Sequence, residues 1–200
     1  MGFGRHIDNL IGKLKVGLGA LKKILKIANF ATRKNIMDGL INSHITYMLT
    51  LWGGAPAYKM DAIQKLQTEA LRIVTKRKWE ENNIRLISTR ELLKQTGKLS
   101  VRQMAFYHTV MQVKKVLTNE QPEYLYRKLT ENVTTHKYDL RGRAEKRSLQ
   151  KIGKAGNLTT KAFINRSIED YNRLPINLRE MPLGGFKKSV RLWTMNNVSI

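Results

Sequence analysis

The chain has 200 residues, 42% of them hydrophobic, which is enough to bury one fair-sized core or two small ones. Its 37 Lys and Arg against 15 Asp and Glu give a formal net charge of +22, and the absence of cysteine excludes disulfides, zinc fingers and a thiol nucleophile. No apolar run approaches the ~18 residues of a membrane span, and lysines interrupt every candidate signal-peptide core. We therefore expect no transmembrane segment and a nuclear or cytoplasmic location.

The positive charge is spread along the whole chain. Residues 1–60 hold nine basic and two acidic side chains, residues 61–130 fourteen and seven, and residues 131–200 fourteen and six. A disordered basic tail would instead concentrate the charge in one block. Such an excess opposes a compact state by self-repulsion unless a polyanion or an acidic partner neutralises it. We expect RNA or DNA as that partner, with an anionic membrane or a ribosome-like structural role as alternatives.

A first helix is predicted over residues 6–28. Apolar side chains recur there at three- and four-residue spacing and form one stripe, with the lysines largely off it. Gly12, Gly17 and Gly19 each cost about 1 kcal/mol relative to alanine in a helix interior. Packing of the apolar stripe must therefore hold this helix.

Two more amphipathic helices are predicted to follow. The second covers about 32–51 and is ended by the Gly-Gly-Ala-Pro run at 53–56, and the third covers about 58–76. Three consecutive amphipathic helices with short links favour a bundle, so we expect a three-helix first domain over residues 1–78.

The next helices are predicted from their end signals. Ser88 with Glu91 forms a capping box, and Gly97 supplies a stop, which predicts a helix of about two turns. Ser100 with Gln103 repeats the capping box and opens a longer helix.

The last third of the chain is more irregular. Pro122 suits the first turn of a short helix. Residues 132–156 lack periodicity and are rich in basic side chains, which predicts a loop with at most a weak strand over 148–152. The remaining predicted elements are a helix over about 161–171, a turn at 172–175 and a last helix over about 186–195. The expected fold class is mainly α, with a smaller helical domain over 79–200 that contains at most a short β-hairpin.

Four short motifs occur in order along the chain. They are His6-Ile7 with Lys13-Leu14, then Ser43-His44-Ile45-Thr46-Tyr47-Met48-Leu49-Thr50-Leu51-Trp52-Gly53, then the segment 63–74 (IQKLQTEALRIV), and finally Tyr171-Asn172-Arg173-Leu174-Pro175 with Phe186-Lys187. Together they resemble the region just after the catalytic palm in the reverse transcriptases of non-LTR retrotransposons, LINE-like enzymes of the jockey and CR1 type. The chain departs from that pattern at Tyr171, where the family usually has tryptophan.

The resemblance implies that the chain is a fragment of an RNA-directed DNA polymerase. Residues 1–78 would be its thumb-like bundle, and residues 79–200 a basic connection and C-terminal domain. In an intact enzyme this region would clamp the RNA/DNA template–primer duplex through Lys and Arg contacts to phosphates. A palm domain elsewhere in the parent polypeptide would hold Mg²⁺, so we expect no cofactor for this chain.

The carboxylates of the sequence do not suggest catalysis. Polymerase chemistry needs paired carboxylates that hold two Mg²⁺ ions, and no Asp-Asp occurs in the chain. Glu80-Glu81, in a predicted polar loop, and Glu169-Asp170, on a predicted helix, are interpreted as solvated charges. The histidines lack metal-ligand spacing and are interpreted as structural: His6, His44, His108 and His136. We expect no catalytic residue, no metal site and no enzymatic activity of this chain alone.

Two groups of candidate residues result. Those expected to contact nucleic acid are Lys13, Lys22, Lys23, Lys26, Lys76, Arg77, Lys78, Trp79, Arg141, Arg143, Lys146 and Arg147. Those expected to shape the fold through the family motifs are His44, Tyr47, Trp52, Gly53, Tyr171, Asn172, Leu174, Pro175 and Phe186. For Tyr47 and Trp52 we predict burial in the bundle core, with Trp52 over Leu66, Ala70 and Ile73. The alternative for either aromatic residue is stacking on the primer strand.

Two other functions remain open. Residues 7–28 alone resemble a cationic amphipathic helix, which would suit a protein acting at anionic membranes. Against it, the aromatic residues lie outside that helix, and the helices downstream offer a core for its apolar face. A standalone RNA-packaging or ribosome-associated protein would need no family resemblance.

Overall fold

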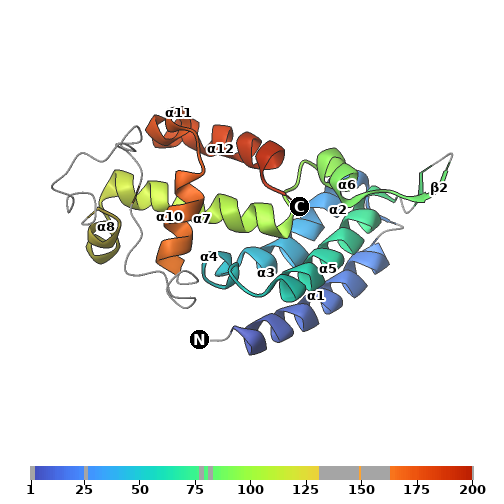
Figure 1. Cartoon of the computed structure of the whole chain (residues 1–200). Coiled ribbons are helices and arrows are strands. Elements are labelled where there is room, and N and C mark those ends of the chain that lie inside the picture. Colours follow the sequence, from blue (N-terminus) through green and yellow to red (C-terminus); the bar gives the residue numbers. More distant parts are fainter. Residues whose placement is uncertain are drawn as a thin grey trace. The chain divides into compact units, whose positions relative to one another are not determined.

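The fold is mainly α, as the sequence predicts (Figure 1). The computed structural model describes residues 3–24, 27–76, 79–80, 83–130, 149 and 163–199, and between 79 and 86 it describes the backbone alone. The chain divides into two compact units, Met1–Ala105 with Ser199–Ile200, and Phe106–Val198.

The first unit contains a run of helices and one pair of short strands. In chain order they are α1 (Gly4–Ile24), α2 (Phe30–Met37), the π-helix η1 (Asp38–Asn42), α3 (Ser43–Thr46), α4 (Leu49–Trp52), α5 (Ala57–Thr75), β1 (Trp79–Glu80), β2 (Asn83–Leu86), α6 (Thr89–Thr96) and the start of α7 (Val101–Asn119).

Helices α1 and α5 lie side by side and run in the same direction (Figure 1). Near their beginnings, Lys59 Nζ lies 3.0 Å from Asp8 Oδ1. Towards their ends, Lys22 Nζ lies 2.6 Å from Glu69 Oε1. The chain must therefore return between them, and it does so through α2, η1 and α3. Residues of α2 and η1 contact both α1 and α5, and residues of α3 contact α1. The identity of this arrangement with a thumb-like three-helix bundle remains a prediction.

The second predicted helix is interrupted, so its continuity over 32–51 is a wrong prediction. Asn29 caps the start of α2, and the helix passes through η1 into α3. It breaks at Tyr47 and Met48, where Met48 has a left-handed φ of 51°. The indole Nε1 of Trp52 donates a hydrogen bond of 2.8 Å to the Tyr47 carbonyl. That carbonyl is therefore satisfied outside the helical ladder, which allows the break.

Gly17 lies where α1 meets η1. A Cβ at this position would lie 2.8 Å from the Leu40 carbonyl oxygen and 3.0 Å from Ile41 Cδ1. Only glycine allows the two backbones to approach this closely. At Gly12 and Gly19 a Cβ would meet nothing within 4 Å, so packing does not require glycine at these two positions.

The capping signals around α6 and α7 are confirmed. The Ser88 hydroxyl accepts from the Glu91 N–H over 3.3 Å, and α6 ends at Gly97, which has a left-handed φ of 65°. Before α7, the Ser100 N–H donates to Gln103 Oε1 over 3.0 Å, and the Gln103 N–H donates to Ser100 Oγ over 3.2 Å. This is the reciprocal pair of hydrogen bonds that defines a capping box.

The first unit extends beyond residue 78, the end of the first domain that the sequence predicts. Gln67 of α5 donates to the Leu99 carbonyl over 3.0 Å, and Gln64 Oε1 accepts from the Val101 N–H over 2.8 Å. These hydrogen bonds attach the α6–α7 link to α5, so the unit ends only at Ala105, inside α7.

The short hairpin lies in this unit, as an antiparallel pairing of Trp79 with Leu86 and Glu80 with Asn83. Glu80 is therefore a strand residue, and its interpretation as a loop residue is wrong. Strand pairing uses backbone groups, so the charge of the Glu80 side chain does not reveal it.

The second unit contains the rest of α7, α8 (Glu123–Thr130), α10 (Phe163–Asn172), α11 (Ile176–Glu180) and α12 (Leu183–Asn197). Pro122 directly precedes α8, close to the position that the sequence predicts. The last helix begins before residue 186 because Pro182 occupies its N-cap. The predicted loop at 132–156 and its weak strand lie outside the described residues, apart from Leu149.

Candidate nucleic-acid interface

The two sides of α1 differ sharply in chemistry. Its buried side chains are Ile7, Leu10, Leu14, Leu18 and Leu21. Its exposed cations are Arg5, Lys13, Lys15, Lys22 and Lys23. The apolar stripe that the sequence predicts is thus confirmed, and it faces η1 and α5.

Four of these cations have no carboxylate partner among the residues that the structure describes: Arg5, Lys13, Lys15 and Lys23. We call these four the α1 basic face. The nearby acidic side chains are already paired. Ion pairs in the first unit join Lys22 to Glu69, Lys59 to Asp8, Lys98 to Asp38 and Arg102 to Asp61. The charge of the α1 basic face is therefore not compensated by the described part of its own unit.

The structure sorts the predicted contact residues into three groups. Lys13 and Lys23 belong to the α1 basic face, and Lys76 is exposed as the left-handed C-cap of α5. Lys22 differs because it is bound to Glu69, which its sequence position does not reveal. The other candidates lie outside the described residues or, for Trp79, have an undescribed side chain: Lys26, Arg77, Lys78, Trp79, Arg141, Arg143, Lys146 and Arg147.

Because α1 and α5 are parallel, Lys22, Lys23 and Lys76 lie at the same end of the unit. Helix C-termini carry partial negative charge, which cations stabilise and phosphates avoid. The lysines at this end are therefore explained by their favourable interaction with the two helix C-termini. Lys13 and Lys15, in the middle of α1, have no such interaction, and this part of the helix is the better place for an anionic ligand. Arg5 and Lys15 were missed as candidates, although a helical wheel places both off the apolar stripe.

The motif residues of the first unit have unequal roles. Trp52 is 1% exposed and its ring lies 6.2 Å from that of His6, so the predicted burial is confirmed. Tyr47 is 64% exposed, and its predicted burial is wrong, because the break at Met48 turns the chain before Tyr47 can enter the core. Gly53 is sterically required, since a Cβ there would lie 2.6 Å from the Leu49 carbonyl oxygen.

The motif residues of the second unit are structural. Tyr171 is 4% exposed, and Leu174 and Phe186 are also buried. The Asn172 amide brackets one residue: Nδ2 donates to the Leu149 carbonyl over 2.7 Å, and Oδ1 accepts from the Leu149 N–H over 2.9 Å. Pro175 caps α11. The motif therefore precedes one helix and binds the backbone of Leu149, which is 23 residues away in sequence.

Asp170 is not the solvated charge that the sequence suggests. Its side chain is 17% exposed, and burial raises the pKa of the carboxyl to about 6, against the opposing effect of Arg166 and Arg173. Arg173 NH1 lies 3.8 Å from Asp170 Oδ1. No sequence pattern predicts this burial, because it results from packing around α10.

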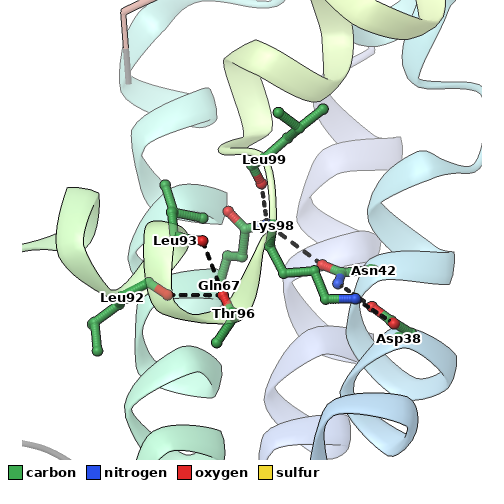
Figure 2. A network of polar contacts seen from close by, with 8 residues as sticks. All are labelled: Asp38, Asn42, Gln67, Leu92, Leu93, Thr96, Lys98 and Leu99. Carbon is green, nitrogen blue, oxygen red and sulfur yellow. Dashed lines mark hydrogen bonds and ion pairs between the residues drawn. The ribbon is translucent and has the colours of Figure 1, made fainter. Parts of the chain in front are cut away.

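A buried polar network joins η1, α5 and the α6–α7 link (Figure 2). Gln67, fully buried, also donates weakly to Asn42 Oδ1 over 3.4 Å, and Asn42 Nδ2 donates to Asp38 Oδ1 over 2.7 Å. Lys98 completes the chain through its ion pair with Asp38. Satisfied networks of this kind fix how elements pack, and here every member has a partner within the unit.

Comparison with known proteins adds no relative: no family model, curated protein or solved structure matches the chain. Within the described ranges there is no group of three or more His, Asp or Glu side chains that could hold a metal ion. In the same ranges, none of the helices has both the length and the apolarity needed to cross a membrane.

Proposed function

We propose that this chain binds nucleic acid without catalysing a reaction, as the thumb and connection region of a non-LTR retrotransposon reverse transcriptase. The observation that carries the binding proposal is the α1 basic face. Its cations project from a helix whose opposite side is anchored in the core, and the nearby carboxylates are paired with other cations. An exposed helix side with uncompensated cations suits a phosphate backbone, because each contact releases counterions.

The family assignment is supported by the roles of the motif residues. Trp52 closes the break between α3 and α4, and Asn172 binds the backbone of Leu149. Sequence motifs with such structural roles fit a shared fold better than a chance match. In an intact enzyme this region would clamp the template–primer duplex, and the palm would supply the Mg²⁺ chemistry.

The membrane alternative is less well supported. Membrane binding by α1 would use its apolar stripe, and that stripe is covered by η1 and α5. Opening the unit would expose five fully or nearly fully buried side chains of α1 to water. Burial of each such side chain is worth roughly 1.5–3 kcal/mol.

The test is a salt titration with a 20-base-pair RNA/DNA hybrid. We expect sequence-independent binding whose log K falls with log[salt] at a slope of about −5, if ~6 phosphates are contacted. The double substitution Lys13→Gln, Lys15→Gln, in the middle of α1, should reduce the steepness of that slope by about 2. Lys22→Gln is the matched control, because it removes the same charge from the same helix but from an existing ion pair, and should change the slope less.

Two results would contradict the proposal. A slope near zero, or tighter binding to anionic vesicles than to the hybrid, would favour the membrane alternative. Template-dependent primer extension by the purified chain with Mg²⁺ would contradict the non-catalytic assignment.

A further inference from the structure

Large hydrophobic side chains gather, exposed, at the end of the first unit where α1 and α5 begin. The residues are Phe3, Tyr47, Met48, Leu51 and Tyr58, and we call them the aromatic edge. Tyr47 and Tyr58 are the most open, at 64% and 69% exposed.

Contacts of their immediate neighbours in sequence place all five at this end of the unit. Lys59 Nζ donates to the Gly4 carbonyl over 3.2 Å, which brings Tyr58 near Phe3. The rings of His6 and Trp52 are 6.2 Å apart, which brings the start of α1 near α4. Trp52 in turn binds the Tyr47 carbonyl. Every member of the aromatic edge is thus one of these residues or lies next to one in sequence.

The backbone holds part of this edge in a strained form. Met48 has a φ of 51°, in the left-handed region that side-chain-bearing residues usually avoid. The buried indole of Trp52 donates a hydrogen bond to the carbonyl of Tyr47, the residue before Met48. This bond stabilises the turn that leaves the Tyr47 side chain outside the core. Strain of this kind persists where the surrounding structure imposes it, and it concentrates at functional sites.

The positive charge near the aromatic edge indicates which kind of ligand it would bind. Arg5 of the α1 basic face lies two residues from Phe3. The acidic residues near the starts of α1 and α5, Asp8 and Asp61, are paired with Lys59 and Arg102. A second copy of the chain would bring the same formal charge of +22 and would be repelled. A polyanion that also offers flat aromatic surfaces fits both features, since bases stack on exposed aromatic side chains while cations hold the phosphates.

We infer that the aromatic edge takes unpaired bases of single-stranded nucleic acid, stacked on Tyr47 and Tyr58, while the phosphates of that strand lie on the α1 basic face. This inference rests on the proposed nucleic-acid binding and adds a substrate class to it. The duplex would use the cations alone, and a single strand would use the cations and the two rings.

The test compares a fluorescent 20-nucleotide oligo-dT with a 20-base-pair hybrid by anisotropy. The double substitution Tyr47→Leu, Tyr58→Leu should weaken oligo-dT binding at least about fivefold and leave hybrid binding unchanged. Tyr47→Phe with Tyr58→Phe keeps both rings and should bind oligo-dT like the parent. Tyr124→Leu is the matched control, because Tyr124 is equally exposed, at 68%, but lies on α8.

The outcomes separate the two proposals. If the Leu variant binds oligo-dT like the parent while the hybrid still binds, the stacking inference is wrong and the proposed function stands. If both ligands lose affinity equally, the rings are not a single-strand site, and the inference is again wrong. No binding of either ligand at low salt would contradict both. A parent that self-associates in sedimentation, with a monomeric Leu variant, would assign the edge to a second copy instead.

Discussion

At the scale of single residues, Trp52 decides the shape of the region between α3 and α5. Its ring is buried and its Nε1 satisfies the carbonyl of Tyr47, so one side chain both fills the core and ends a helix. The neighbouring exposed tyrosine depends on this arrangement. An identical apolar pattern without the indole donor would favour a continuous helix.

Substitutions at Trp52 should separate these two roles. Trp52→Ala should lower the free energy of unfolding by about 3–5 kcal/mol, the usual cost of emptying a buried tryptophan site. Trp52→Phe keeps most of the ring but leaves the Tyr47 carbonyl without its donor, and should cost a further hydrogen-bond contribution of about 1 kcal/mol beyond the lost volume. Urea unfolding followed by circular dichroism measures both. Lys76 is exposed, so Lys76→Ala should have the same free energy of unfolding as the parent. Equal losses of stability in Trp52→Ala, Trp52→Phe and Lys76→Ala would contradict the two roles assigned to Trp52.

The glycines of α1 make a matched set. Gly17→Ala places a Cβ against the Leu40 carbonyl and should destabilise by about 1–3 kcal/mol, which outweighs the ~1 kcal/mol gained in helix propensity. Gly12→Ala and Gly19→Ala meet open space and should stabilise by up to about 1 kcal/mol each. Thermal melts of the three variants provide the measurement. Stabilisation by Gly17→Ala would mean that α1 and η1 lie farther apart than the structure places them.

At the scale of elements, α10 carries a buried acid in a strongly basic chain. Asp170 is surrounded by charges from its own helix and the residue after it, with Arg166 and Arg173 favouring its ionised form and Glu169 opposing it. Desolvation is the largest effect, so the pKa stays raised at about 6. The folded state therefore holds this proton more tightly than the unfolded state does.

The sign of the pH dependence follows from that raised pKa. Between about pH 4 and pH 6 the unfolded chain loses the Asp170 proton before the folded chain does, so stability falls as pH rises through this window. The loss is on the order of 2–3 kcal/mol and is complete above pH 6. Asp170→Asn cannot ionise, so its stability relative to the parent should rise over this range and then level off. Urea unfolding from pH 4 to pH 7.5 tests this, with Asp61→Asn, at an exposed carboxylate, for comparison. A constant difference would contradict the burial of Asp170.

At the scale of the whole molecule, charge opposes the fold. A net charge of +22 on 200 residues repels itself, and screening or a bound polyanion relieves that repulsion. The α1 basic face shows the same imbalance locally, since none of its cations pairs with a carboxylate in the part of the chain that the structure describes. Bound nucleic acid would therefore also raise the free energy of unfolding of the chain.

The melting temperature at low ionic strength should accordingly rise when salt is added, and should rise further with inorganic polyphosphate at equal ionic strength. Neutral dextran is the control, because it adds bulk without charge. Differential scanning fluorimetry measures all three. A melting temperature that falls with added salt would mean that the ion pairs of the first unit, such as Lys22 with Glu69, outweigh the repulsion.

The sequence alone determined the features that depend on near neighbours in the chain. The apolar stripe of α1, the extent of α5, the N-cap at Ser88 and the capping box at Ser100 follow from helical periodicity and from hydrogen bonds that span three residues. The cations of α1 could also be placed on its outer side from their spacing. Local physics is sufficient for these, because the groups that interact are a few residues apart.

The tertiary structure alone decided which of those groups are free and which are buried. Lys22 is compensated because α5 runs parallel to α1 and brings Glu69 to it, across 47 positions of sequence. Tyr47 is exposed because Trp52 takes its carbonyl, and Asp170 is buried by the packing around α10. Burial and charge pairing depend on what a fold brings from elsewhere in the chain, and no periodicity in one segment carries that information.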